Sequence, residues 1–175
     1  MKRFLILLFS LMLTVCCETT SYKTYSTKYR VFFSCNIMDA PYNQAISRGC
    51  FISIRKNNGK LLFVDSNGNK SDMELTAVQS ASFMLGLAGL IIGTPTFDND
   101  NTSVWAYDLG CPECDEPGKR LTFDNTQPGI AFCSSCQGKW NMNSSGISVN
   151  TDDKKRRPLY RYPTSMNNGV LTVSN

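Results

Sequence analysis

CPECDEPGKRLTFDNTQPGIAFCSSCQGKWNMNSSG, residues 111–146, contains two Cys-x-x-Cys pairs: Cys111 with Cys114, and Cys133 with Cys136. A Cys-x-x-Cys turn places two sulfur atoms on one side of a tight loop. Two such loops that face each other form a tetrahedral four-sulfur site, which suits Zn²⁺ or iron. The spacing therefore predicts a metal site with these four ligands. Two disulfides in an oxidising compartment are the alternative reading of the same pattern.

The composition narrows the classes of function. The chain of 175 residues contains no histidine, which excludes Ser-His-Asp and Cys-His nucleophilic units and zinc sites with histidine ligands. No pair of carboxylates stands out by its spacing, so the composition favours a binding or structural protein over an enzyme. The formal net charge of +4 is weak, and we expect no nucleic acid partner. The basic run at 154–157 follows two aspartates and is expected to form a solvated loop.

The first seventeen residues, MKRFLILLFSLMLTVCC, have the pattern of an export signal. Two basic residues precede an apolar run at 4–15, which is too short to span a bilayer. The run ends at two adjacent cysteines, and this order resembles a bacterial lipoprotein signal. The resemblance implies cleavage after residue 15 and lipidation of Cys16, with Cys17 as the alternative. An ordinary secretory signal with incidental cysteines is the competing interpretation.

Lipidation would define how the rest of the chain is organised. Acyl chains on the new N-terminal cysteine would hold the protein on a membrane surface. Residues 16–28 are rich in Thr, Ser, Tyr and Lys and are expected to act as a flexible tether. Residues 29–175 then form one domain in the bacterial cell envelope, on the periplasmic or surface face of the outer membrane. The membrane and an unidentified envelope protein are the expected partners.

Short strand patterns fill most of residues 29–175 and predict a mostly β sandwich or small barrel. The expected strands lie at 29–35, 50–55, 61–65, 90–93, 104–109, 119–123, 130–133, 158–162 and 169–175. Turns are expected at 57–60 and 66–72. Residues 74–85 are the one stretch that suggests a helix, with Thr76 as its N-cap.

Two further cysteines, Cys35 and Cys50, lie at the ends of two expected strands. In an exported protein this pair could form a disulfide. Two buried free thiols are an equally good interpretation, because a free cysteine packs as a small apolar side chain.

VWAYDLGCPEC is similar to the strand and first ligand loop of a Rieske iron–sulfur domain, and FCSSCQGKWNMNSSG is similar to the second ligand loop of that family. The resemblance covers about residues 29–175 and is sharpest from Trp105 to the end. RPLYRYP with NNGVLTVSN resembles the closing strands. The resemblance implies a Rieske-like β fold with an inserted zinc-ribbon-like metal subdomain at about 105–146, within a small bacterial lipoprotein.

The ligands depart from that family in a consistent way. Rieske clusters use two histidines on one iron, whereas Cys114 and Cys136 stand near those places here. The resemblance thus implies a rubredoxin-like or zinc-ribbon-like Cys₄ site in a Rieske-like frame. We expect zinc, because the signal has no twin-arginine motif and the chain is expected to cross the membrane unfolded. Mononuclear iron or a [2Fe–2S] cluster, with a role in electron transfer, is the alternative.

Overall fold

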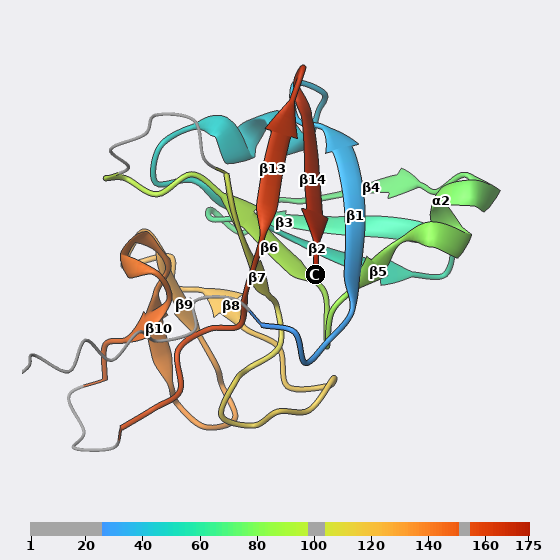
Figure 1. Cartoon of the computed structure of the whole chain (residues 1–175). Helices are drawn as coiled ribbons and strands as arrows, with labels where there is room; N and C mark the ends of the chain where they lie inside the picture. Colours follow the sequence, from blue (N-terminus) through green and yellow to red (C-terminus); the bar gives the residue numbers. More distant parts are fainter. Residues whose placement is uncertain (1–25, 98–103, 151–154) are drawn as a thin grey trace, which may run out of the picture.

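The computed structural model describes residues 26–97, 104–150 and 155–175. The protein is mostly β, as the strand pattern predicts, with three antiparallel sheets (Figure 1). The outer sheet has the order β13-β14-β1-β5, and its strands are Thr164–Asn167, Val170–Ser174, Val31–Asn36 and Met84–Leu85.

The largest sheet has six strands in the order β12-β7-β6-β2-β3-β4. In that order the strands are Arg161–Tyr162, Trp105–Asp108, Leu90–Gly93, Phe51–Asn57, Lys60–Asp65 and Lys70–Glu74. The small sheet has the order β11-β10-β9-β8, and its strands are Ile147–Ser148, Lys139–Asn141, Ile130–Phe132 and Thr122–Phe123. In Figure 1 the small sheet lies at the lower left, away from the outer sheet.

Two hydrophobic clusters occupy the two faces of the six-stranded sheet. On one face, Ile52 and Ile92 pack in a cluster with Phe33 and Val173 of the outer sheet. On the other face, side chains including Phe51 and Tyr107 pack with residues of the small sheet and the loops around it. The six-stranded sheet is therefore the middle layer of the molecule.

This middle position explains the apolar run of β6. A strand with one solvated face alternates apolar and polar residues, whereas a strand covered on both faces reads as a continuous apolar run. All four residues of β6, Leu90–Gly93, are buried. Leu90 and Ile92 face the outer sheet, and Ile91 belongs to the cluster beside the small sheet.

A helix forms within the expected range 74–85, but it is shorter than that range. The helix α2 covers Ala77–Ser82, and Thr76 is its N-cap. The Thr76 side chain accepts a hydrogen bond from the Gln79 backbone N–H, and the Gln79 side chain accepts one from the Thr76 backbone N–H, which forms a capping box. The ends of the expected range belong to strands instead, because Glu74 ends β4 and Met84 pairs with Phe32 in β5.

The turn expected at 66–72 is also shorter, because β4 begins at Lys70. Two short 3₁₀ helices complete the described elements: η2 at Tyr42–Ile46 and η3 at Met142–Ser144. None of the helices within the described ranges is long and apolar enough to cross a membrane. The expected export signal and lipidation site lie outside the described residues.

The disulfide suggested for Cys35 and Cys50 is not formed in the structure, where both thiols are free. The two cysteines belong to different layers of the fold. Cys35 is buried in β1 of the outer sheet, whereas Cys50 directly precedes β2 of the middle sheet. Burial raises the pKa of the Cys35 thiol to about 12, as expected for an inert thiol inside a core.

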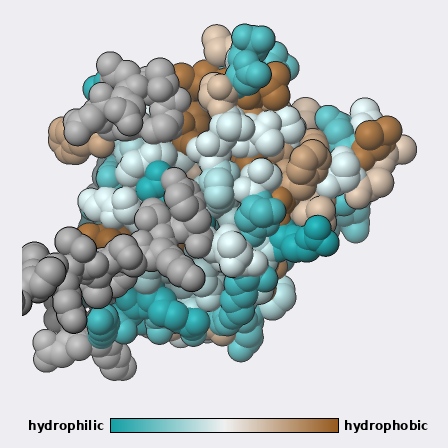
Figure 2. Space-filling view, viewed as in Figure 1, coloured by the Kyte–Doolittle hydropathy of each residue, from teal (hydrophilic) through white to brown (hydrophobic). Residues whose placement is uncertain are grey.

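The surface is mixed in character. Several large apolar side chains are exposed, among them Val78, Met38 and Phe97. Figure 2 shows apolar groups interspersed with polar ones on the face seen there. Scattered apolar residues of this kind are normal on a protein surface, so this face carries no indication of a broad apolar interface.

Candidate metal centre

The four cysteines lie in an excursion of the chain out of the middle sheet. Strand β7 leaves that sheet at Asp108, and β12 returns to it and pairs with β7. The residues between them build the small sheet and two tight turns. We call residues 111–115 the first knuckle and residues 133–137 the second knuckle. The first lies between β7 and β8, and the second joins β9 to β10.

The structure brings all four predicted sulfurs together. The Sγ atoms of Cys111, Cys114, Cys133 and Cys136 all lie within 4.8 Å of one another. The Sγ atoms of Cys111 and Cys136 are 3.5 Å apart, and those of Cys114 and Cys133 are 3.9 Å apart. Tetrahedral zinc with Zn–S distances of about 2.3 Å requires sulfurs about 3.8 Å apart. The four cysteines could therefore hold one metal ion.

The two knuckles have the same local geometry. In the first, the backbone N–H groups of Glu113 and Cys114 donate hydrogen bonds to the Cys111 sulfur. In the second, the N–H groups of Ser135 and Cys136 do the same for the Cys133 sulfur. Hydrogen bonds of this kind stabilise the thiolate form that binds a metal.

Each knuckle also ends on a residue with left-handed backbone. Asp115 has φ of 55° and Gln137 has φ of 58°, and each directly follows the second cysteine of its pair. This conformation reverses the chain after the last ligand, so that both sulfurs of a pair stay on one side of the turn. Side chains other than glycine adopt it at a cost of about 1–2 kcal/mol per residue.

The thiols differ in how readily they ionise. Burial raises the pKa of the Cys111 thiol, against the opposing effect of the two backbone N–H groups. Burial also raises the pKa of Cys114. For Cys133 burial acts in the same direction, but the N–H groups of Cys136 and Ser135 and the neighbouring thiols outweigh it, so its pKa is lowered.

The first knuckle is held by residues from distant parts of the chain. The Asp115 carboxylate accepts hydrogen bonds from the Lys28 ammonium, from Tyr29 and from Tyr160. These contacts lower the pKa of Asp115 to about 2, with the Lys28 and Tyr29 hydrogen bonds as the largest causes. The Arg157 N–H donates to a Glu113 carboxylate oxygen at 2.6 Å.

Ser26 and Lys28 were expected to belong to the tether, yet both contact the fold. The Ser26 N–H donates to the Arg161 carbonyl, and the side chain of Asn175 donates to the Ser26 carbonyl. Lys28 reaches Asp115. We call residues 26–30 the clasp, because they lie against both the first knuckle and the end of the chain.

The second knuckle is held mainly by its own hairpin. The Gln137 side chain donates to the Ser134 carbonyl, and the Asn150 side chain donates to the Gln137 carbonyl at 3.0 Å. Beneath it, the ring of Trp140 is fully buried and its Nε1–H donates to the Arg157 carbonyl at 2.8 Å. Gly138 lies against that ring, where a Cβ atom would clash.

Sequence patterns gave no indication of the residues around the first knuckle. The positions of Glu113 and Asp115 on either side of Cys114 carry no recognisable spacing signal toward Lys28 or Arg157. One weaker signal was available, because aspartate directly after a Cys-x-x-Cys pair is among the few residues that tolerate left-handed backbone.

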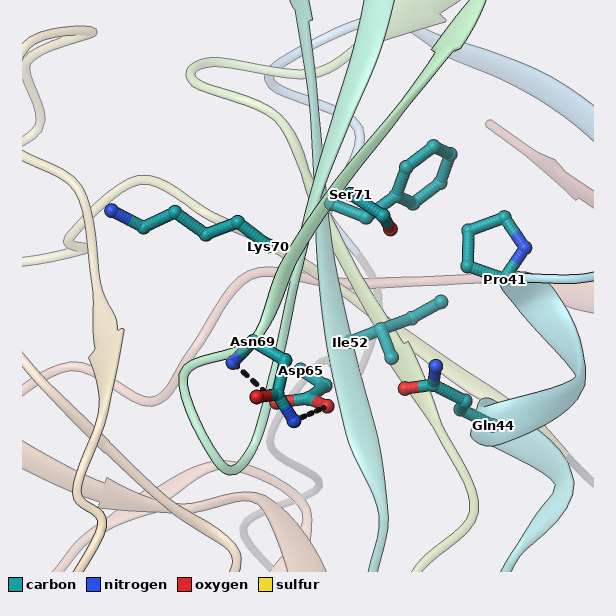
Figure 3. A pocket seen from close by; sticks show the side chains of 8 residues that line it. Pro41, Gln44, Ile52, Asp65, Asn69, Lys70 and Ser71 are labelled. Atoms are coloured by element: carbon teal, nitrogen blue, oxygen red, sulfur yellow. Dashed lines mark hydrogen bonds between the residues drawn. The ribbon is translucent and has the colours of Figure 1, made fainter.

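A small pocket lies elsewhere, beside η2 and the turn between β3 and β4 (Figure 3). Its volume is about 90 Å³, and Ile52, Gln44 and Asp65 are among its lining residues. The Asp65 carboxylate accepts hydrogen bonds from the backbone and side chain of Asn69 and from the Asn67 N–H. The one carboxylate that lines the pocket, Asp65, is thus already used to stabilise the turn. The cysteine cluster is therefore the better candidate for a functional site.

Comparison with known proteins finds neither a matching family model nor a matching curated sequence. The chemistry of the site therefore has to be inferred from its geometry. Four thiolates around one ion leave no coordination position for a substrate, which is the arrangement of a structural metal site and not of a catalytic one.

Proposed function

We propose that this protein is a lipid-anchored protein of the bacterial cell envelope, whose β domain is a binding or structural module stabilised by a metal ion. The observation that supports the metal part of the proposal is the convergence of four cysteine sulfurs within 4.8 Å. We propose zinc as the ion, because zinc can bind after the chain has crossed the membrane and folded. When bound, the ion would supply no reaction of its own and would hold the second knuckle to the first.

The proposed fold is Rieske-like, with a metal-binding unit inserted between strands of a larger sheet. The pairing of β7 with β12 supports it, because the small sheet and both knuckles lie between these strands in the sequence. The ligand set differs from that of Rieske clusters. We therefore propose a Rieske-like β fold without the histidine-ligated cluster.

An iron-based electron carrier is the second candidate. One observation favours it: Cys114 and Cys136 are only partly buried, so that an ion bound there would lie near the surface, as electron transfer requires. All four sulfurs lie within 4.8 Å of one another, and this fits one iron ion better than a [2Fe–2S] cluster, which spreads its ligands over two irons.

Elemental analysis of protein purified from the native envelope tests the metal proposal. We expect one zinc per chain, no visible absorption, and loss of the metal in Cys133→Ser but not in Cys50→Ser. Cys50 is a suitable control because it is a partly buried thiol outside the site. A coloured protein with iron and a reversible redox couple would support the electron carrier instead. Metal-free native protein would contradict both.

The lipid anchor has a separate test, because residues 1–25 are outside the described structure. Mass spectrometry of the mature N-terminus should find a cysteine that carries acyl chains, and Cys16→Ala should abolish the modification. Loss of the modification in Cys17→Ala alone would move the anchor to Cys17. An unmodified N-terminus in the native protein would contradict membrane anchoring by lipid.

A further inference from the structure

Each knuckle contributes one buried and one partly exposed thiol. Cys111 and Cys133 are buried, whereas Cys114 and Cys136 are reached by solvent. The Cys111–Cys136 contact at 3.5 Å and the Cys114–Cys133 contact at 3.9 Å both run from one knuckle to the other. Each contact therefore joins a partly exposed thiol of one knuckle to a buried thiol of the other.

We infer that the four-cysteine site is also an oxidation site, at which a small-molecule disulfide displaces the metal and the knuckles become joined through Cys111–Cys136 and Cys114–Cys133. This inference rests on the proposed metal site and adds a second, covalent state to it. In that state the two disulfides do what the ion does, because they hold the second knuckle to the first.

The oxidation needs no reagent other than the small-molecule disulfide and the four cysteine thiolates. The partly exposed Cys136 thiolate attacks one sulfur of the small disulfide, forms a mixed disulfide and releases the first small thiolate. The Cys111 thiolate then attacks the Cys136 sulfur, forms the protein disulfide and releases the second small thiolate. Cys114 and Cys133 consume a second molecule of oxidant in the same way. Each oxidant molecule takes up two electrons, and Zn²⁺ leaves with its charge unchanged.

The exposed thiols decide where the reaction begins. Thiol–disulfide exchange requires access of the oxidant to the attacking sulfur. Among the four cysteines, only Cys114 and Cys136 are partly exposed, so we expect the oxidant to reach these two first. The buried partner then lies next to the mixed disulfide, on the opposite knuckle.

The folded and the unfolded protein are expected to form disulfides between different pairs of cysteines. Only two residues separate the cysteines within a pair, whereas 18 separate Cys114 from Cys133 and 24 separate Cys111 from Cys136. Loop closure therefore favours pairing within each Cys-x-x-Cys in an unfolded chain. Pairing between the knuckles requires the folded site to bring the sulfurs together first.

The experiment treats zinc-loaded Cys50→Ser protein with oxidised glutathione, because this variant lacks the one partly exposed thiol that residues 26–97, 104–150 and 155–175 carry outside the site. A colorimetric chelator follows zinc release, and mass spectrometry of proteolytic peptides maps the disulfides. We expect loss of all bound zinc and the pairs Cys111–Cys136 and Cys114–Cys133. The same protein, stripped of metal and oxidised in guanidinium chloride, should instead give pairs within each Cys-x-x-Cys.

Two results would overturn the inference: pairs within each knuckle in the folded protein, or zinc and thiols that persist in excess oxidant. Near-ultraviolet circular dichroism gives an independent readout. The oxidised, metal-free protein should keep its signal, and the reduced, chelated protein should lose part of it. Elemental analysis before oxidation tests the proposed function separately, because protein that takes up no zinc would contradict that function, while the disulfide map still decides the pairing.

Discussion

The first knuckle, residues 111–115, and the second knuckle, residues 133–137, share a backbone but differ in their neighbours. In both, two N–H groups point at the first sulfur and a left-handed residue follows the last ligand. The clasp and Arg157 hold the first knuckle through Asp115 and Glu113. The second has no comparable support from distant residues within the described part of the chain, so the metal is expected to matter most for the second.

The largest expected effect comes from removing a ligand of the second knuckle. Structural zinc contributes about 10–16 kcal/mol in small peptides, and a larger domain depends on it less. We expect Cys133→Ser to cost about 4 kcal/mol, which corresponds to a melting temperature lower by about 8–16 °C. Thermal unfolding measures this. Cys50→Ser should change stability by about 0.5 kcal/mol or less, and equal effects of the two variants would contradict a metal at the knuckles.

A smaller effect is expected from the glycines that follow the knuckles. A Cβ atom on Gly138 would clash with the buried ring of Trp140, so Gly138→Ala should cost about 1–3 kcal/mol. Nothing lies within 4 Å of a Cβ atom added to Gly118, so Gly118→Ala should cost less than about 0.5 kcal/mol. Urea denaturation gives both values. A tolerated alanine at Gly138 would mean that Trp140 can move.

Replacing the two left-handed residues, Asp115 and Gln137, with glycine is expected to change the stability of the protein in opposite directions. Glycine at position 137 removes the cost of left-handed backbone and loses only an exposed hydrogen bond from the Gln137 side chain to the Ser134 carbonyl. We therefore expect Gln137→Gly to stabilise the protein by about 0.5 kcal/mol. Asp115→Gly removes the same cost but also the hydrogen bonds from Tyr29 and Tyr160. We expect a net destabilisation of about 1 kcal/mol.

Equilibrium unfolding of the two glycine variants, side by side, tests this difference. Asp115→Asn is a useful third variant, because asparagine also tolerates left-handed backbone and keeps an acceptor oxygen. It should fall between the wild type and Asp115→Gly. If Asp115→Gly were as stabilising as Gln137→Gly, the clasp would contribute nothing to the first knuckle.

The cysteine cluster and most long strands were predictable from the sequence, and for different reasons. The two cysteine pairs follow from spacing, because a Cys-x-x-Cys turn sets the position of its own sulfurs. Strands such as β2 and β6 carry apolar residues because they fill the core. For these strands the structure agrees with the sequence, because the signal is local and the residues are buried.

Two of the missed strands lack such a local signal. Strand β4, Lys70–Glu74, is a polar edge strand without a buried residue, and β13, Thr164–Asn167, is likewise an edge strand with no buried residue. Both exist because a neighbouring strand offers backbone hydrogen bonds. The contacts of Lys28 and Arg157 with the first knuckle join residues far apart in sequence, and no spacing pattern encodes them.

The smallest expected effect concerns acid stability of the hairpin that carries the second knuckle. The Thr126 hydroxyl, the Lys139 ammonium and the Thr126 N–H hydrogen-bond to the Asp124 carboxylate and lower its pKa to about 2. The pKa of an unfolded aspartate is about 3.9. A carboxylate whose pKa is lower in the folded state stabilises the protein above the unfolded value and loses this contribution as the pH falls through the folded value.

We therefore expect Asp124→Asn to be less stable than the wild type above about pH 4, with a difference that disappears by about pH 2. Thermal unfolding from pH 6 to pH 2 measures the difference between the two proteins, and protonation of the cysteine ligands affects both alike. Lys139→Gln should give part of the effect, because the contacts with Thr126 stay in place. A difference between wild type and Asp124→Asn that does not change with pH would show that the Asp124 charge is not what holds this hairpin.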